Sequence, residues 1–192
     1  MHAARAVAIF ISLLAMCCVV PRAAAQQSTD IVVSQASVRI NGVNVRTGPK
    51  VATVRYFSLA AAEKALGRPE QTYRAGLGVQ VYSWRKVGVN FQEGFRASDK
   101  NKLFKFQVWL ADSPMNAQDK YTGKFKGHVR VDGLDISSET TLDAIRPELQ
   151  ERGYKVTEYP HITTAVKGET AIWTVGTTNR IECVEVFCGS QT

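Results

Sequence analysis

The sequence lacks the short motifs that mark common catalytic and metal-binding sites. Its 192 residues include three histidines, and neither His128 nor His161 has a second ligand at metal-binding spacing. No HExxH, CxxC or GxSxG motif occurs. The stretch Gly76-Leu77-Gly78 has neither the further glycines nor the Lys-Ser/Thr pair of a phosphate loop. We therefore expect a non-enzymatic protein with no catalytic residue, no cofactor and no metal site.

Carboxylates leave one enzymatic alternative open. Glu148 and Glu151 fall on the polar side of an expected helix, and Glu182 and Glu185 lie near the C-terminus. The two carboxylates of a glycosidase need only meet in space, so their spacing in the sequence does not exclude a pair. A hydrolase with an unrecognised site, supported by converging carboxylates or by a pocket containing both histidines, remains the alternative.

Long hydrophobic runs are absent except at the start of the chain. The apolar run from Ala6 to Val20 follows Arg5 and precedes Ala23-Ala24-Ala25. This order is typical of a secretory signal peptide, and the run is shorter than the roughly 20 residues that span a bilayer. We expect a signal peptide at 1–25, cleavage after Ala25, and a periplasmic or secreted protein.

Cysteine is scarce, and half of it lies in the expected signal peptide. Cys17 and Cys18 suggest lipid attachment as an alternative, although the bulky residues before them are poor neighbours for that reaction. In a strand, Cys183 and Cys188 would lie about 16 Å apart on opposite faces. Since a disulfide needs Cα atoms roughly 4.4–6.8 Å apart, we expect two buried thiols, with an intermolecular bridge left open.

The charge is moderately basic, at +7 overall. Lysines and aromatic residues alternate through 96–106 and 119–130, a pattern that could stack nucleic acid, but acidic residues are interspersed. In an exported protein we expect these lysines on solvated strand faces, with no nucleic-acid partner. Peripheral contact with an anionic membrane surface is the alternative.

The sequence repeats one pattern. Val38–Val45 reads VRINGVNV, and Val129–Ile136 reads VRVDGLDI, each with the Asn-Gly or Asp-Gly of a tight hairpin. A capped amphipathic segment follows each copy: one begins at Ser58 and ends at Gly67, and the other ends at Gly153. Pro147 in the second predicts either a helix that starts late or two short helical pieces.

Matching strands follow each helical segment. The first copy has a Trp84…Gly88 pair and closes on the strand 106–110, and the second has Trp173…Gly176 and closes on 184–188. We therefore predict an α+β fold made of two tandem repeats, each a short helix packed on a small antiparallel sheet. The predicted ranges are 36–112 for repeat one, 113–124 for the linker and 125–190 for repeat two.

The closing strands also suggest a binding surface. Alternation places Phe106 and Val108 on a core face, and Lys105, Gln107 and Trp109 on the other. Phe187 and Glu185 occupy equivalent positions in the second copy. Large aromatic side chains on an outward sheet face are typical of protein-binding sites. We expect these five residues to contact a partner, unless a loop or the N-terminal segment covers them.

This pattern resembles a known architecture. With its NG and DG hairpins, capped helices, and Trp84 and Trp173, the chain resembles the β-lactamase inhibitory protein. A single copy is similar to the small lipoprotein of the outer-membrane β-barrel assembly machine, and the layout also resembles uncharacterised exported bacterial proteins and periplasmic immunity proteins. The resemblance implies a sheet that clasps another protein of the envelope, as an inhibitor or immunity protein does. The alternative is an envelope assembly or lipid-associated factor.

Overall fold

The computed structural model describes residues 28–94, 102–111, 123–175 and 179–189. The expected signal peptide and most of the expected linker lie outside the described residues, so those boundaries stay predictions. Within the described ranges, no helix is long and apolar enough to cross a membrane.

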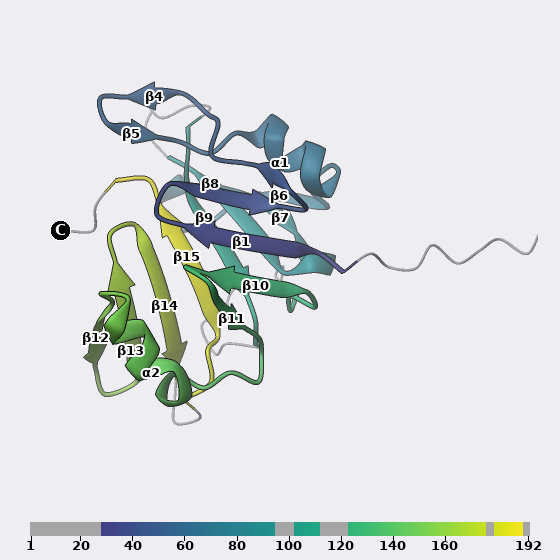
Figure 1. Ribbon diagram of the computed structural model, residues 1–192. Helices are drawn as coiled ribbons and strands as arrows, with labels where there is room; N and C mark the ends of the chain where they lie inside the picture. Colours follow the sequence, from purple (N-terminus) through teal and green to yellow (C-terminus); the bar gives the residue numbers. More distant parts are fainter. Residues whose placement is uncertain (1–27, 95–101, 112–122, 176–178, 190–192) are drawn as a thin grey trace, which may run out of the picture.

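The described chain forms two main β-sheets, a small hairpin and two α-helices (Figure 1). The five-stranded sheet has the order β11 (Leu134–Ile136), β10 (His128–Val131), β1 (Asp30–Ser34), β2 (Ser37–Ile40), β3 (Val43–Asn44). The eight-stranded sheet has the order β12 (Lys155–Glu158), β13 (Ile162–Lys167), β14 (Thr170–Val175), β15 (Cys183–Phe187), β9 (Leu103–Trp109), β8 (Val89–Glu93), β7 (Gln80–Trp84), β6 (Gln71–Arg74). The remaining elements are the hairpin β4 (Lys50–Val51) and β5 (Val54–Arg55), the helices α1 (Leu59–Leu66) and α2 (Leu142–Glu151), and the 3-10 turns η1 (Gly76–Gly78) and η2 (Arg85–Val87).

The prediction of an α+β fold made of two tandem repeats, each a short helix packed on its own small antiparallel sheet, is wrong. β9 and β15, expected to close two separate sheets, pair antiparallel with one another and join both halves into one eight-stranded sheet. β1, which precedes the expected first repeat, pairs in parallel with β10 and joins the halves a second time. Pairing removes two sheet edges, whose backbone donors and acceptors would otherwise be left without partners. The structure is therefore mainly β, with helices of only eight and ten residues in its described part.

The two predicted hairpins are confirmed. Asn41 and Gly42 have φ angles of 50° and 78°, and Asp132 and Gly133 have φ angles of 46° and 87°. Positive φ at both central residues is the type I′ geometry that Asn-Gly and Asp-Gly favour, and its twist matches that of the flanking strands. These turns fix the register of β2 with β3 and of β10 with β11.

Both helices begin at side-chain caps. The Ser58 hydroxyl accepts a hydrogen bond from the Ala61 N–H (3.2 Å), and the Thr141 hydroxyl accepts one from the Ala144 N–H (3.4 Å). The expected interruption at Pro147 is wrong, because α2 runs through it as one helix. Buried Leu149 holds the last turn of α2 against the core, so packing offsets the backbone bond that proline removes.

The core lies between the two sheets. Figure 1 shows β1, β2 and β10 in front of the eight-stranded sheet, with α2 on the same side beside β12 and β13. Phe91 is the centre of an aromatic cluster, with ring centroids 5.7 Å from Trp84 and 5.0 Å from Phe106. The core side chains of both helices and both sheets belong to this single cluster, so each half lacks a separate core.

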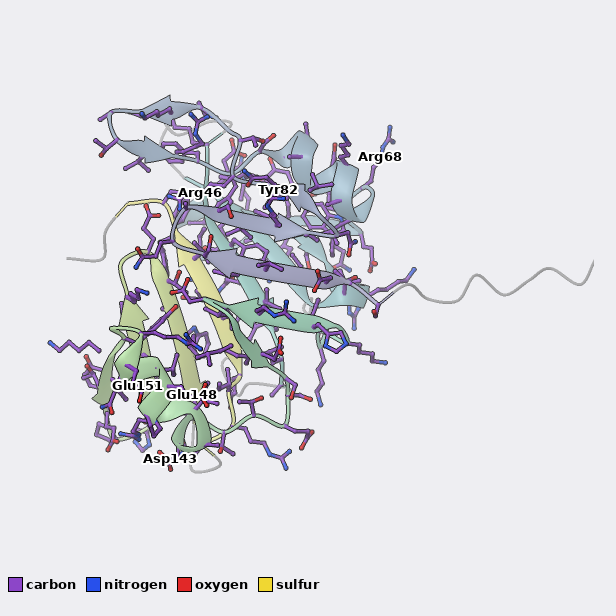
Figure 2. All side chains as sticks on the ribbon, viewed as in Figure 1. Arg46, Arg68, Tyr82, Asp143, Glu148 and Glu151 are labelled. Carbon is purple, nitrogen blue, oxygen red and sulfur yellow. The ribbon has the colours of Figure 1, made fainter. Side chains whose placement is uncertain are left out.

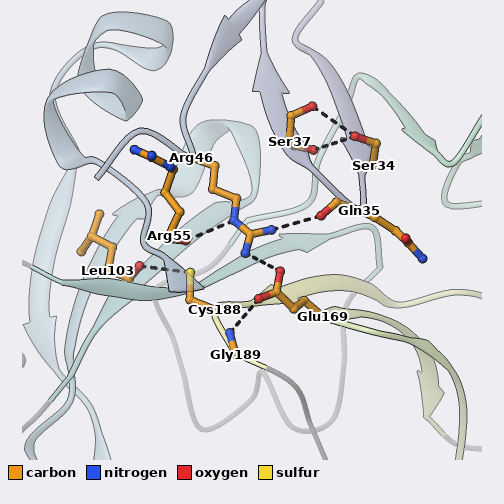
Figure 3. Close-up of polar contacts among 9 residues, drawn as sticks. All are labelled: Ser34, Gln35, Ser37, Arg46, Arg55, Leu103, Glu169, Cys188 and Gly189. Carbon is orange, nitrogen blue, oxygen red and sulfur yellow. Dashed lines mark hydrogen bonds and ion pairs between the residues drawn. The ribbon is translucent and has the colours of Figure 1, made fainter. Parts of the chain in front are cut away.

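One buried arginine connects three loops at an end of this core (Figure 3). The Arg46 guanidinium donates to the carbonyl oxygens of Arg55 (3.1 Å) and Gln35 (3.3 Å) and forms an ion pair with Glu169. The Glu169 carboxylate also accepts the Gly189 N–H at 2.8 Å. The Arg46 side chain is only 9% exposed and Glu169 is 22% exposed, so solvent screens the pair weakly.

Replacing Arg46 should therefore destabilise the fold. We expect Arg46→Met to lower the free energy of unfolding by about 3 kcal/mol, because it removes the only cation paired with the Glu169 carboxylate among the described residues and the guanidinium donor of two carbonyls. The matched control is Arg39→Met, since Arg39 is exposed on β2, and a change there should stay within about 0.5 kcal/mol. Urea denaturation measures both, and equal midpoints for the two variants would contradict the assignment.

Candidate functional site

The eight-stranded sheet has one face packed on the core and a second face, here called the outer face. The five predicted binding residues come together on the outer face, because Lys105 is directly opposite Phe187 and Gln107 opposite Glu185 across the β9–β15 pair. Trp109 is opposite Cys183 in the same register. Both helices pack on the other side of the sheet, and among the described residues no helix or strand covers the outer face.

A row of polar side chains crosses the middle of the outer face. Strand register places five of them on neighbouring strands, from β6 to β15: Gln71, Ser83, Asn90, Gln107 and Glu185. All of them except half-buried Gln71 are less than 9% exposed. The row is therefore a layer of polar side chains that exposes little of its own surface, unlike an ordinary solvated strand face.

The row contains a charged hydrogen-bond network. The side-chain amide nitrogen of Gln92 donates to the side-chain oxygen of Gln107 at 2.9 Å. The side-chain amide nitrogen of Gln107 in turn donates to the Glu185 carboxylate. The Lys105 ammonium lies 2.9 Å from the same carboxylate and 4.9 Å from the centroid of the Phe187 ring. Each group has a partner that opposes its rotation, and the network therefore holds Lys105 and Phe187 in fixed positions.

The expectation that Trp109 is exposed is wrong. Its side chain is 5% exposed. The Trp173 ring of β14 packs edge-to-face against it, with the ring centroids 5.2 Å apart, and the Phe125 N–H donates to its backbone carbonyl. The indole Nε1 of Trp109 has no hydrogen-bond partner in the described part of the molecule. Trp109 therefore packs beneath Trp173 and does not reach the surface, whereas Phe187 and Trp173 are half-buried.

Sequence reasoning missed the apolar half of the outer face. Half-buried Ile162, Val166, Trp173 and Val175 of β13 and β14 lie on it, beside the Trp109 end of the sheet. The alternation in Ile162–Lys167 and Thr170–Val175 was a sufficient signal, since residues at every second position of a strand share a face. The outer face thus has an apolar half next to its polar row.

Glu185 does not meet the two helical carboxylates that were considered for a hydrolase. Figure 2 shows Glu148 and Glu151 on α2, with Asp143 on the same helix. α2 packs on the core side of the sheet, whereas Glu185 lies on the outer face, so the sheet separates them. His128 is the first residue of β10, His161 lies in the bend before β13, and both side chains are exposed. Among the described residues, no three His, Cys, Asp or Glu side chains group as metal ligands.

The two thiols are free, and they lie on opposite sides of the last strand as the sequence predicted. Cys183 is fully buried on the outer face, and its burial raises the pKa of the thiol well above the usual value. Cys188 packs against the core, its thiol donates to the Leu103 carbonyl at 3.7 Å (Figure 3), and burial raises its pKa to about 12. Both groups are therefore neutral thiols near pH 8.

Comparison with known proteins adds one distant structural neighbour. No protein-family model matches the sequence, and no curated protein matches it. Among solved structures, the chain is similar to YjgB, a DUF4309 family protein of Bacillus subtilis subsp. subtilis str. 168, with 12% identity and a TM-score of 0.37 over 75% of this chain and 89% of that one. A likeness at this level supports no functional argument. It does not link the chain to the β-lactamase inhibitory protein or the assembly lipoprotein, so that resemblance stays a hypothesis.

The thiol pKa values predict slow alkylation in the folded protein. At pH 8, iodoacetamide should modify Cys188 at least about tenfold more slowly in the native protein than in urea, and Cys183 more slowly still, because little thiolate is present. Peptide mass spectrometry over a time course measures each site. Native labelling of Cys183 as fast as in urea, or a disulfide-linked dimer, would contradict this assignment.

Proposed function

We propose that this chain is an exported, non-enzymatic binding protein that captures a protein partner of the cell envelope through the outer face. The observation on which this rests most is the fixed polar row from Gln71 to Glu185, flanked by the half-exposed rings of Phe187 and Trp173. The role is that of an inhibitor or immunity protein, which occludes its partner and does not modify it.

The outer face has the two components that protein interfaces combine. Aromatic rings held in place lose little conformational entropy on binding, so Phe187, placed against Lys105, and Trp173, placed against Trp109, are suitable central anchors. The polar row is itself largely buried, and its amide and carboxylate groups fix the Lys105 and Phe187 side chains beside it. A partner that contacts Phe187 and Lys105 therefore does not have to order these two side chains first.

The site also differs from the one expected from sequence. Trp109 is too deeply buried to contact a partner, and its place is taken by Trp173, which packs against it. Gln107 and Glu185 orient Lys105 and Phe187, so we assign them to positioning the anchors. Val175 and Ile162 extend the contact surface away from the polar row.

Site-specific cross-linking tests this proposal. Replacing Phe187 or Trp173 with p-benzoylphenylalanine in the producing cell should yield the same cross-linked envelope protein after irradiation. The photoreactive residue at Arg39, exposed on the five-stranded sheet, is the matched control and should yield no such adduct. Equal adducts at all three positions, or none at the two outer-face positions, would count against the outer face as the interface.

Once the partner is identified, affinity gives a second test. Phe187→Ala and Trp173→Ala should each weaken binding at least tenfold, the usual loss for an anchor near the centre of an interface. Arg39→Ala should leave the affinity within about twofold. Thermal unfolding of each variant separates lost contacts from lost folding.

A further inference from the structure

A second surface, apart from the polar row, has the features of an anion site. A cleft of about 460 Å³ is lined by Glu70, Arg85, Lys86, Gly123, Lys124 and Lys126. It lies where η2 connects β7 to β8, against the segment that leads into β10. We call it the basic cleft.

Close backbone contacts build the basic cleft. A Cβ atom at Gly123 would lie 2.1 Å from the Arg85 carbonyl oxygen, and one at Gly88 would lie 2.3 Å from the Phe125 nitrogen. Only glycine permits both approaches, so these two positions bring η2 and the 123–126 segment into direct contact. Two basic turns are thereby fixed side by side.

Phe125 anchors the second of these turns. Its ring is 5% exposed within the core cluster, and its N–H donates to the Trp109 carbonyl at 2.7 Å. The neighbours on either side, Lys124 and Lys126, are exposed and both line the cleft. The anchored ring therefore holds two lysines opposite Arg85 and Lys86, so four basic side chains line one cleft.

The charge in the basic cleft is strongly unbalanced. Four basic side chains surround one carboxylate, that of Glu70, which is already directed to the Lys86 backbone N–H at 3.3 and 3.4 Å. Within the described residues, the side chains of Arg85, Lys86 and Lys126 form no ion pair with an acidic group. Cations held together in this way repel one another, and a bound anion would relieve the repulsion.

We propose that the basic cleft binds a phosphate-bearing anion. Phosphate presents several acceptor oxygens and up to two charges per group, which suits a guanidinium fork combined with lysine ammonium groups. Such a group is supplied either by a free phosphate compound or by the head group of a lipid at a membrane surface. This proposal does not depend on the outer face, because it uses a different set of side chains.

Binding of pyrophosphate and of vesicles distinguishes these sources. The protein should bind pyrophosphate in isothermal titration calorimetry, and Arg85→Gln/Lys126→Gln should weaken that binding at least tenfold. The control, Arg39→Gln/Lys155→Gln, removes the same charge from exposed positions on other strands and should change the affinity less than twofold. Glu70→Gln should strengthen binding, since it removes the opposing charge.

Vesicles test the lipid source. If the protein sediments with phosphatidylglycerol vesicles, and Arg85→Gln/Lys126→Gln abolishes this while the control variant does not, the site binds a lipid head group. If the protein binds pyrophosphate but not the vesicles, the site binds a free phosphate compound. Loss of pyrophosphate binding by the same factor in both double variants would overturn the proposal, since it would show only a general charge effect. Absence of binding to either probe by the folded wild-type protein would also overturn it.

Discussion

The pairing of β9 with β15 is the constraint on which the rest of the structure depends. The two strands lie 74 or more positions apart in the chain, yet five residue pairs align them in one antiparallel register, from Cys183 with Trp109 to Phe187 with Lys105. That register joins four strands from each half into one sheet and removes two exposed edges. It also determines which side chains share the outer face, because a slip of one residue would exchange Gln107 and Glu185 with the core positions.

The polar network on the outer face is better explained by specificity than by stability. Burying Glu185 and Lys105 costs desolvation energy that their mutual attraction only partly offsets, so an apolar pair of similar volume would serve the fold as well. What the charged pair adds is orientation: it holds the ammonium group over the Phe187 ring and sets one register between two strands from opposite halves. Arg46 acts at the other end of the core, where three loops depend on one guanidinium.

Local features were predictable from the sequence, and the long-range pairings were not. Asn41-Gly42, Asp132-Gly133 and the cap at Ser58 are signals contained within a few residues, and the structure has each of them. The alternation of β9 correctly placed Lys105 and Gln107 on the face opposite Phe106, but it could not show that β15 pairs there, since nothing in one strand specifies its neighbour. The burial of Trp109 was missed for the same reason, because it depends on Trp173 from a strand more than 60 residues away in sequence. β1 was missed because its short alternation lies outside the repeated pattern.

A double-mutant cycle between Lys105 and Glu185 tests the central claim most directly. These residues come from opposite halves of the chain, and the structure places the ammonium 2.9 Å from the carboxylate. If β9 and β15 pair in this register, the unfolding free energies of Lys105→Met, Glu185→Gln and the double variant should be non-additive, with a coupling of roughly 1 kcal/mol or more. Additive effects, with the variants folded and both strands protected, would contradict the pairing and with it the outer face.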